Sequence, residues 1–225
     1  MLIHEGEPVA IFQHRRLKEV PASGGAAAVA IAEPPELTLV DQALALLRAL
    51  EWEGVAMFEF RYDRAQRRGF LMEVNGRYWG TVALAIHSGM DFPWYEWQIA
   101  HGEKPLVPVN YAVGPRWRWS AGYIRRWHGL ARGSIHMALR HPGGLRELVP
   151  SFTDLKTSDA LWDPADPMPA IVEPLRAVKN LAVSDSKAIL RMLRPAPLRS
   201  EEGGKAKLAL ANVQEARRTD DKDPR

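Results

Sequence analysis

The chain has 225 residues, of which 46% are hydrophobic and 25% charged, so it can bury the core of one or two soluble domains. It contains no cysteine, which excludes disulfides, zinc–thiolate sites and a cysteine nucleophile. The formal net charge is only +3, and no apolar run approaches the ~20 residues of a membrane-spanning helix. Because the first residues lack the basic and apolar regions of a signal peptide, we expect a cytoplasmic protein without a transmembrane segment.

The first fifty residues predict two strands and a helix. Residues 9–16 begin apolar and become polar, which predicts one strand, and the small apolar residues 26–32 predict another. Residues 21–25, rich in glycine with one proline, predict a loop between them. The helical spacing of Leu39, Ala43, Leu46, Leu47 and Leu50 predicts a helix that ends before Gly54. Thr38 and Asp41 resemble a capping box at its start.

The next fifty residues predict a hairpin followed by two short helices. Residues 55–60 and 70–75 read as strands, and the mostly polar residues 61–69 suit the connection between them. Residues 81–87 and 91–101 predict helices, with Asp91 as an N-cap and Pro93 in the first turn of the second.

Beyond residue 105 the composition changes to tryptophan and arginine. A helix there could present one face made of Tyr123, Trp127, Leu130, Ser134 and Met137. Residues 154–174 are proline-rich and predict a loop, and residues 172–193 predict one or two helices. The charged residues after 195, poor in aromatics, predict a disordered tail.

These elements predict an α/β (α+β) fold, in which helices cover an antiparallel sheet. We divide the chain into a subdomain over residues 1–104, a helical Trp/Arg-rich extension over 105–194, and the tail over 195–225.

The hairpin carries the most informative polar residues. Side chains alternate along a strand, so Glu73, Asn75 and Arg77 share one face. A connection centred near Gln66 places Glu59 directly opposite Glu73, with Cβ atoms about 4.5–5.5 Å apart. Two carboxylates this close repel each other unless a positive charge lies between them, and Mg²⁺, which prefers oxygen ligands, meets that need. The alternative is an ordinary solvated face of acidic side chains, although acids inserted in apolar strands usually need a partner.

The same segments resemble a known family. GVAMFEF (residues 54–60), FLMEVNGRYWG (residues 70–80) and IHSGMDFP (residues 86–93) resemble the C-terminal subdomain of ATP-grasp proteins, in the carboxylate–amine ligase branch related to carbamoyl-phosphate synthase. FQHRRLKEVP (residues 12–21) and SGG (residues 23–25) are similar to the same branch. The resemblance covers about residues 9–103, and the segment beyond resembles a variable tail of some members.

The resemblance implies a role for each of several residues. It implies that Glu59, Glu73 and Asn75 hold Mg²⁺ or Mn²⁺ against the phosphates of ATP. It implies that Arg77 contacts phosphate or an acyl phosphate; Gly76 stands before it where the family often has proline.

Four further residues complete the set that the resemblance implies. Arg16 and Arg15 are implied to face the phosphates or the substrate carboxylate. Gly24 and Gly25 are implied to belong to a loop near the reacting centre.

The implied activity is ATP- and Mg²⁺-dependent ligation of a small-molecule carboxylate to an amine or a thiol through an acyl phosphate. The family's ATP-binding subdomain and its phosphate-binding lysines are not recognisable, since Lys18 is the only lysine before Lys104 and there is no Walker loop. We therefore expect low ATP affinity for this chain alone. It could be an incomplete enzyme, a non-catalytic remnant, or a subunit whose partner supplies the N-terminal half.

The basic stretch over residues 111–146 leaves another alternative open, because it holds seven arginines and no acidic residue. It could bind nucleic acid or a membrane surface, but no known nucleic-acid motif is present, and we favour packing of its tryptophans on the core. The seven histidines show no metal-ligand spacing. His14 is the exception among them, because it lies beside Arg15 and Arg16.

Overall fold

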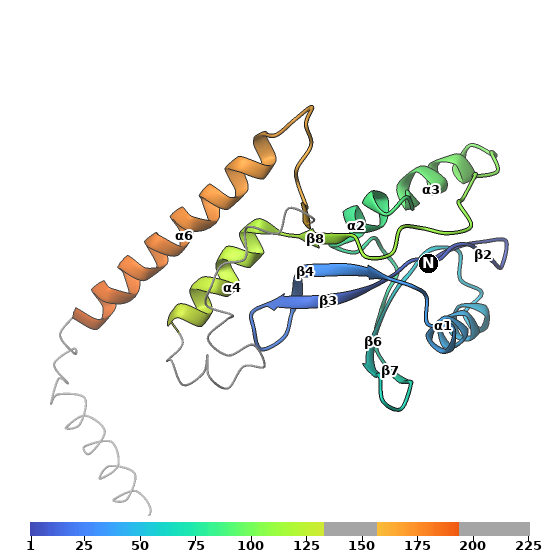
Figure 1. Cartoon of the computed structure of the whole chain (residues 1–225), viewed down its shortest axis with the longest axis horizontal. Helices are drawn as coiled ribbons and strands as arrows, with labels where there is room; N and C mark the ends of the chain where they lie inside the picture. Colours follow the sequence, from blue (N-terminus) through green and yellow to red (C-terminus); the bar gives the residue numbers. More distant parts are fainter. Residues whose placement is uncertain (133–156, 194–225) are drawn as a thin grey trace, which may run out of the picture. The chain divides into compact units, whose positions relative to one another are not determined.

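Antiparallel strands and helices together make up the fold, as the sequence predicts, and its class is α+β (Figure 1). The computed structural model describes residues 1–132 and 157–193, and side chains as far as residue 188. The chain forms two compact units, Met1–Ala182 and Val183–Arg225. The second unit is described only where it continues the last helix. The predicted tail over residues 195–225 lies outside the described residues.

The first sheet contains three short strands in the order β2-β1-β5. They are β1 (Leu2–His4), β2 (Glu7–Ala10) and β5 (Gly54–Val55). The single strand predicted over residues 9–16 is wrong, because β2 ends at Ala10 and β3 (Gln13–Val20) begins a different sheet. Residues 9–12 are all apolar and residues 13–16 all polar, and no glycine or proline separates the two strands, so the sequence pattern does not reveal that the chain changes sheets there.

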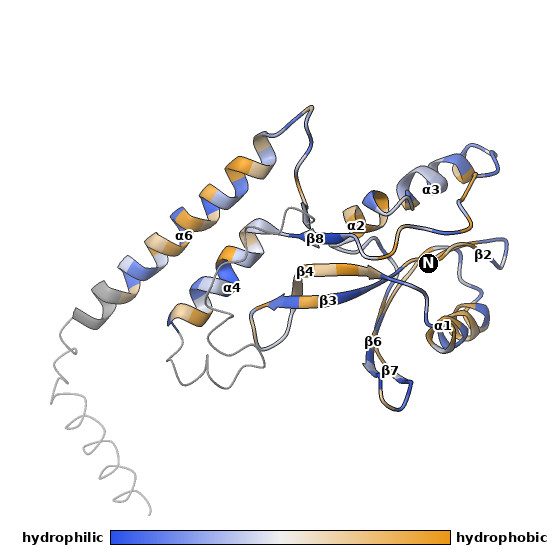
Figure 2. Cartoon of the chain, in the orientation of Figure 1, coloured by the Kyte–Doolittle hydropathy of each residue, from blue (hydrophilic) through white to orange (hydrophobic). Residues whose placement is uncertain are grey.

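The second sheet has the order β3-β4-β8-β9. Strand β4 (Ala26–Glu33) confirms the predicted strand, and the loop predicted over residues 21–25 joins it to β3. Ala28, Ala30 and Ala32 are buried on one face of β4, where small side chains let other elements approach closely. Figure 2 shows this apolar strand beside the hydrophilic β8.

Strands β8 (Arg116–Arg118) and β9 (Thr157–Asp159) lie within the segment 105–194, for which the sequence predicts helices and, over residues 154–174, a loop. β8 pairs antiparallel with β4, and β9 pairs parallel with β8. The second sheet therefore extends across residue 104, and the division of the chain at that residue stays a prediction. Each strand has three residues, too few to show an alternation in sequence.

The hairpin consists of β6 (Met57–Asp63) and β7 (Arg68–Asn75). Its register confirms the prediction that Glu59 lies opposite Glu73. The strands are longer than predicted, because the ladder continues to the pair Asp63–Arg68 and leaves only residues 64–67 as the turn. Asp63 Oδ1 closes this turn by accepting hydrogen bonds from the backbone N–H groups of Ala65 and Gln66.

Helix α1 (Leu37–Ala49) confirms the helix predicted over this region, and Leu39, Ala43 and Leu47 are buried on one side of it. The predicted capping box of Thr38 and Asp41 is wrong, because the N-cap is Glu36 and Thr38 already lies inside the helix. The Pro34-Pro35 pair restricts only the residues before Glu36, so it does not prevent the helix from beginning at Leu37, before the predicted capping box.

Helices α2 (Val82–His87) and α3 (Phe92–Ala100) confirm the two short helices that follow the hairpin. Asp91 is the N-cap of α3, as predicted, and its Oδ1 accepts a hydrogen bond from Trp94 N at 3.1 Å. Phe92, in the first turn, is fully buried in the cluster that also holds Trp79 and Tyr95.

Helices α4 (Ser120–Arg132) and α6 (Met168–Leu193) complete the described elements. Tyr123 and Leu130, which the sequence places on one face of a helix, are buried in α4, whereas Trp127 of the same predicted face is exposed. Ser134 and Met137 lie outside the described residues.

The loop predicted over residues 154–174 is wrong from Met168 onward, because α6 begins there, with a proline in its first turn and Pro174 in its interior. The helix predicted over residues 172–193 is confirmed as one helix.

Burial of Phe92 predicts a large loss of stability on truncation. Phe92→Ala should lower the free energy of unfolding by about 3–5 kcal/mol, because it removes a buried ring and leaves a cavity. Trp94→Ala is the control two residues away, since Trp94 is 49% exposed and should cost less than about 1 kcal/mol. Urea denaturation measures both, and equal losses would contradict the assignment of Phe92 to the core.

Candidate functional site

A groove of about 1150 Å³ lies between β3–β4 and the β6–β7 hairpin, elements that Figure 1 shows next to each other. The loop before β4 and the residues that lead into α2 contribute to its lining. All eight residues singled out in the sequence line this groove: Arg15, Arg16, Gly24, Gly25, Glu59, Glu73, Asn75 and Arg77.

Arg16 and Glu59 form a bidentate ion pair across the groove. Arg16 Nη1 donates to Glu59 Oε1 at 2.7 Å, and Nη2 donates to Glu59 Oε2 at 2.5 Å. Nη1 also donates to the carbonyl oxygen of Gly25 at 3.0 Å and lies 3.3 Å from Glu19 Oε1. Both side chains are roughly two-thirds buried, and this paired fork geometry is the strong form of an arginine–carboxylate contact. The pair therefore connects β3 to β6.

Glu59 and Glu73 face each other across the hairpin, so their carboxylates share one face of it. Glu73 Oε1 accepts a hydrogen bond from Asn75 Nδ2 at 2.9 Å. Two carboxylates and an amide oxygen are hard donors of the kind that Mg²⁺ prefers, and the guanidinium beside Glu59 shows that this face attracts a cation. The donor set thus fits a divalent metal. Among the described residues, no group of three or more His, Cys, Asp or Glu side chains is arranged to hold one, so Asn75 would be the third ligand.

Arg15 and Arg77 line the groove without contacting Glu59. Arg15 Nε donates to Glu33 Oε1 at 2.6 Å, because its side chain leaves the opposite face of β3 from Arg16. Arg77 Nη1 donates to the carbonyl oxygen of Tyr78 at 3.0 Å, and the residue is exposed. Arg77 is therefore accessible to a ligand, whereas Arg15 is held by a carboxylate.

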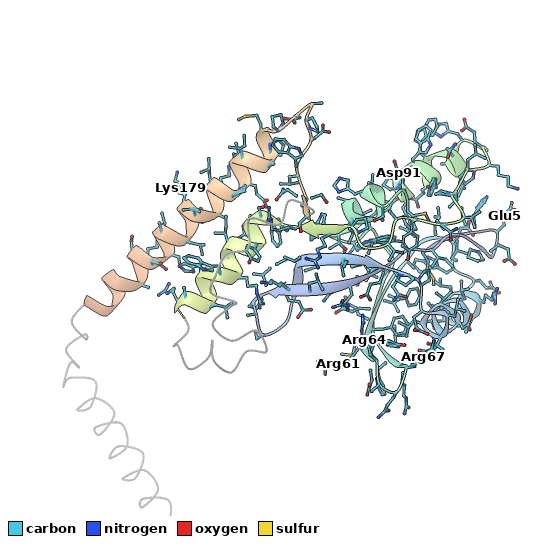
Figure 3. All side chains as sticks on the ribbon, viewed as in Figure 1. Glu5, Arg61, Arg64, Arg67, Asp91 and Lys179 are labelled. Atoms are coloured by element: carbon cyan, nitrogen blue, oxygen red, sulfur yellow. The ribbon has the colours of Figure 1, made fainter. Side chains whose placement is uncertain are left out.

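The sequence did not reveal the contacts that fasten the hairpin tip. Arg64 Nη2 donates to both oxygens of Glu33, and burial of that carboxyl is outweighed by its bonds to Arg15 and Arg64, so the pKa of Glu33 lies below its ordinary value. Glu36 accepts hydrogen bonds from Tyr62 Oη and Arg67 Nη2. Figure 3 shows the tip arginines. The charges are visible in sequence, but their partners are about thirty residues away and only the fold brings them together.

The contact between Glu19 and Arg16 was also not predicted, and the reason lies in the pairing of β3. Strict alternation along β3 places Glu19 on the face opposite Arg16. The pairing of β3 with β4 shifts on either side of Lys18, and this irregularity lets the Glu19 carboxylate reach Arg16.

His14 lies in the groove two residues before Arg16. Its Nε2 shares a hydrogen bond of 3.0 Å with Thr81 Oγ1, and no sequence pattern singles out Thr81. Burial, and to a lesser extent the charge of Arg16 and the N-terminus, lower the pKa of His14 to about 4. The imidazole is therefore neutral at pH 7.

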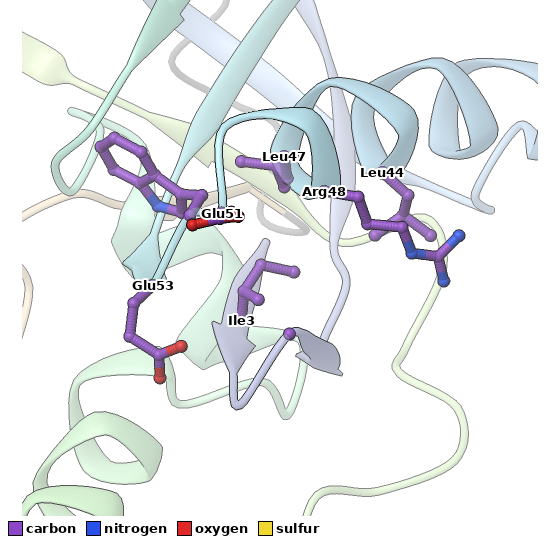
Figure 4. A pocket seen from close by; sticks show the side chains of 8 residues that line it. Ile3, Leu44, Leu47, Arg48, Glu51 and Glu53 are labelled. Carbon is purple, nitrogen blue, oxygen red and sulfur yellow. The ribbon is translucent and has the colours of Figure 1, made fainter.

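A second hollow of about 230 Å³ lies between β1 and the C-terminal end of α1. Figure 4 shows Arg48 and Glu53 on opposite sides of it. Glu53 is engaged with His4 Nδ1 at 2.6 Å and with the backbone N–H of Glu5, so its charge is already satisfied. We assign no site there.

The described part of the Trp/Arg-rich stretch packs against the rest of the fold. Trp117 is buried, and Trp119 Nε1 donates to the Glu173 carboxylate of α6. Arg126 is buried and donates to the carbonyl oxygen of Glu19 at 2.7 Å. The expectation that the tryptophans pack on the core is therefore confirmed for Trp117 and Trp119 and is wrong for Trp127, which is exposed. In the ranges 1–132 and 157–193, no helix is long and apolar enough to cross a membrane.

Comparison of the chain with models of protein families, with curated proteins and with solved structures found no match.

The low pKa of His14 predicts that acid destabilises the fold. Below pH 6.5 the unfolded chain takes up a proton on His14, whereas the folded chain does so only near pH 4. Stability should be fully retained above pH 6.5 and fall as the pH drops toward 4, with a slope of up to about 1.4 kcal/mol per pH unit. Denaturation of the wild type and of His14→Asn at a series of pH values measures this. Equal pH dependence in both would show that His14 does not contribute.

Proposed function

We propose that this chain forms the metal- and phosphate-binding centre of an ATP-dependent ligase. The reaction joins a small-molecule carboxylate to an amine or a thiol through an acyl phosphate. One observation carries the proposal: two carboxylates face each other on the hairpin, with a bidentate arginine beside them in a large groove. The resemblance of the hairpin and its flanks to ATP-grasp proteins supports the same reading.

In this proposal Glu59, Glu73 and Asn75 hold Mg²⁺ or Mn²⁺, which when bound neutralises charge on the phosphates of ATP. The residues of the chain do the positioning. Arg77, exposed at the end of β7, donates hydrogen bonds to the transferred phosphoryl group. Arg16 donates to the same group from the opposite side of the groove.

The loop before β4 has a defined part in that positioning. Gly25 has φ +153°, and a Cβ added to it would lie 2.6 Å from the carbonyl oxygen of Val20. A side chain is therefore excluded at this point, and the backbone of residues 24 and 25 can come close to Arg16. The carbonyl oxygen of Gly25 holds Arg16 Nη1 at 3.0 Å and directs the guanidinium into the groove.

The two chemical steps balance as follows. A carboxylate oxygen of the substrate attacks the γ-phosphorus, and the bond from that phosphorus to ADP breaks. The amine nitrogen or thiol sulfur then attacks the acyl carbon, the bond from that carbon to the phosphate oxygen breaks, and the nucleophile loses a proton. Negative charge stays on the phosphoryl oxygens throughout, where two guanidinium groups stabilise it.

This chain alone should bind ATP weakly. Lys18 lies over the ring of Tyr123, with Nζ 5.3 Å from its centroid, and does not line the groove. The phosphate-binding lysines that the family uses must then come from a segment or chain other than the described residues.

Metal-dependent nucleotide binding is the first test. We expect calorimetry to detect ATP binding only with Mg²⁺ present, and Glu73→Gln to weaken it at least about tenfold, because a ligand charge is lost. Glu7→Gln is the control, since Glu7 is an exposed strand glutamate outside the groove. Absence of binding by the folded chain would contradict ligase activity of this chain alone.

A second candidate function is that of a subunit in a two-chain enzyme, and the exposed outer strand of the hairpin favours it. Phe70, Leu71, Met72 and Val74 of β7 are all exposed, Met72 at 62%. Among the described residues β7 pairs only with β6, so its other edge offers unpaired backbone groups to an incoming strand. The occupant we infer is a strand of the chain that supplies the ATP-binding subdomain. Arg68, on β7 itself, favours an acidic residue on that partner.

This candidate predicts that the β7 edge is dispensable for the fold of the chain itself. Met72→Lys should change the free energy of unfolding by less than about 0.5 kcal/mol, and should lower any self-association seen by sedimentation. Met57→Lys on the paired strand is the matched control and should cost about 1–3 kcal/mol, because Met57 packs on the core cluster. A comparable loss in both variants would show that the chain already covers this edge.

A further inference from the structure

We infer that Arg16 is an internal counterion of Glu59 that must be displaced before a metal can bind there, so that metal and phosphate bind cooperatively. The inference rests on the proposed function, since it assumes that Glu59 is a metal ligand. It goes further by stating how the chain makes the two ligands depend on each other.

The geometry of the pair is the first step. Both carboxylate oxygens of Glu59 accept from the same guanidinium, at 2.7 and 2.5 Å. A divalent cation on that carboxylate would lie directly against Arg16, and the low local exposure of both side chains leaves little water to screen the repulsion. Metal alone should therefore bind weakly.

The second step is that Arg16 has a defined place once it leaves Glu59. Its Nη1 is also held by the carbonyl oxygen of Gly25 and by Glu19 Oε1. These contacts come from the loop and strand on its own side of the groove, so they persist when Glu59 is released. The guanidinium then points its free donors at an anion in the groove, and phosphate is the bidentate acceptor that it fits best.

Charge complementarity points the same way. A divalent metal on Glu59 places two positive charges beside the Arg16 guanidinium, and a phosphate places negative charge beside Glu59 and Glu73. The charges of the two ligands offset each other when both are bound, which is the condition under which each raises the affinity of the other.

Arg15 supplies an internal comparison. It is the neighbouring residue with the same charge, but its guanidinium binds Glu33 at 2.6 Å and not Glu59. Neutralising either arginine changes the net charge of the protein equally, and only the change at Arg16 frees Glu59.

The test is to measure Mn²⁺ affinity by electron paramagnetic resonance, with and without inorganic phosphate, a weak chelator. In the wild type, phosphate should raise Mn²⁺ affinity about tenfold, within the range typical of coupled sites. Arg16→Met should bind Mn²⁺ alone about tenfold more tightly than the wild type and should lose the effect of phosphate. Arg15→Met should behave as the wild type does.

Arg16→Lys keeps a cation that cannot form the fork, and should give an intermediate Mn²⁺ affinity; circular dichroism identifies any variant that does not fold. The inference is overturned if Arg16→Met binds Mn²⁺ no more tightly than the wild type, or if Arg15→Met gains as much. Mn²⁺ binding that is equal in the wild type and all the arginine variants, but is lost in Glu73→Gln, overturns the coupling and leaves the metal centre standing. Absence of Mn²⁺ binding in every folded variant, with and without phosphate, overturns the proposed metal centre as well.

Discussion

Two carboxylates fixed opposite each other on a hairpin repel each other unless a cation lies beside them. Several contacts around the groove either bring positive charge to these carboxylates or hold the hairpin in place. Glu59 and Glu73 cannot move apart, because the ladder of β6 and β7 sets their register. Arg16 satisfies one of them from the neighbouring sheet. The ion pairs at the hairpin tip hold the strands in place against β4 and the start of α1. Positive charge beside these carboxylates reduces the repulsion between them.

The sequence was sufficient for local features and insufficient for those created by distant contacts. The cap of α3 followed from Asp91 with Pro93 in the first turn. The pairing of Glu59 with Glu73 was predicted although the turn is shorter than expected, because a register shift between Glu59 and Phe60 offsets the difference. The junction between β2 and β3 was missed because no glycine or proline marks it. Strands β8 and β9 were missed because three residues cannot show a period.

The same distinction applies to the site. All eight residues selected from the sequence line one groove, but the sequence did not show which arginine contacts which carboxylate. Neighbouring Arg15 and Arg16 look equivalent in sequence. They differ in space because successive side chains of a strand leave opposite faces, so one reaches Glu33 and the other reaches Glu59. The assignment of roles to metal and phosphate remains a proposal that rests on this geometry and on the resemblance.

The two walls of the groove belong to separate sheets, with β3 and β4 in one and β6 and β7 in another. Side-chain contacts join these walls, and among the described residues no backbone ladder runs between them. The exposed arginines at the hairpin tip make ion pairs that weaken as ionic strength rises, whereas the Arg16–Glu59 pair is roughly two-thirds buried and is screened much less. Salt should therefore loosen the tip of the hairpin first and leave the two walls joined at Arg16 and Glu59.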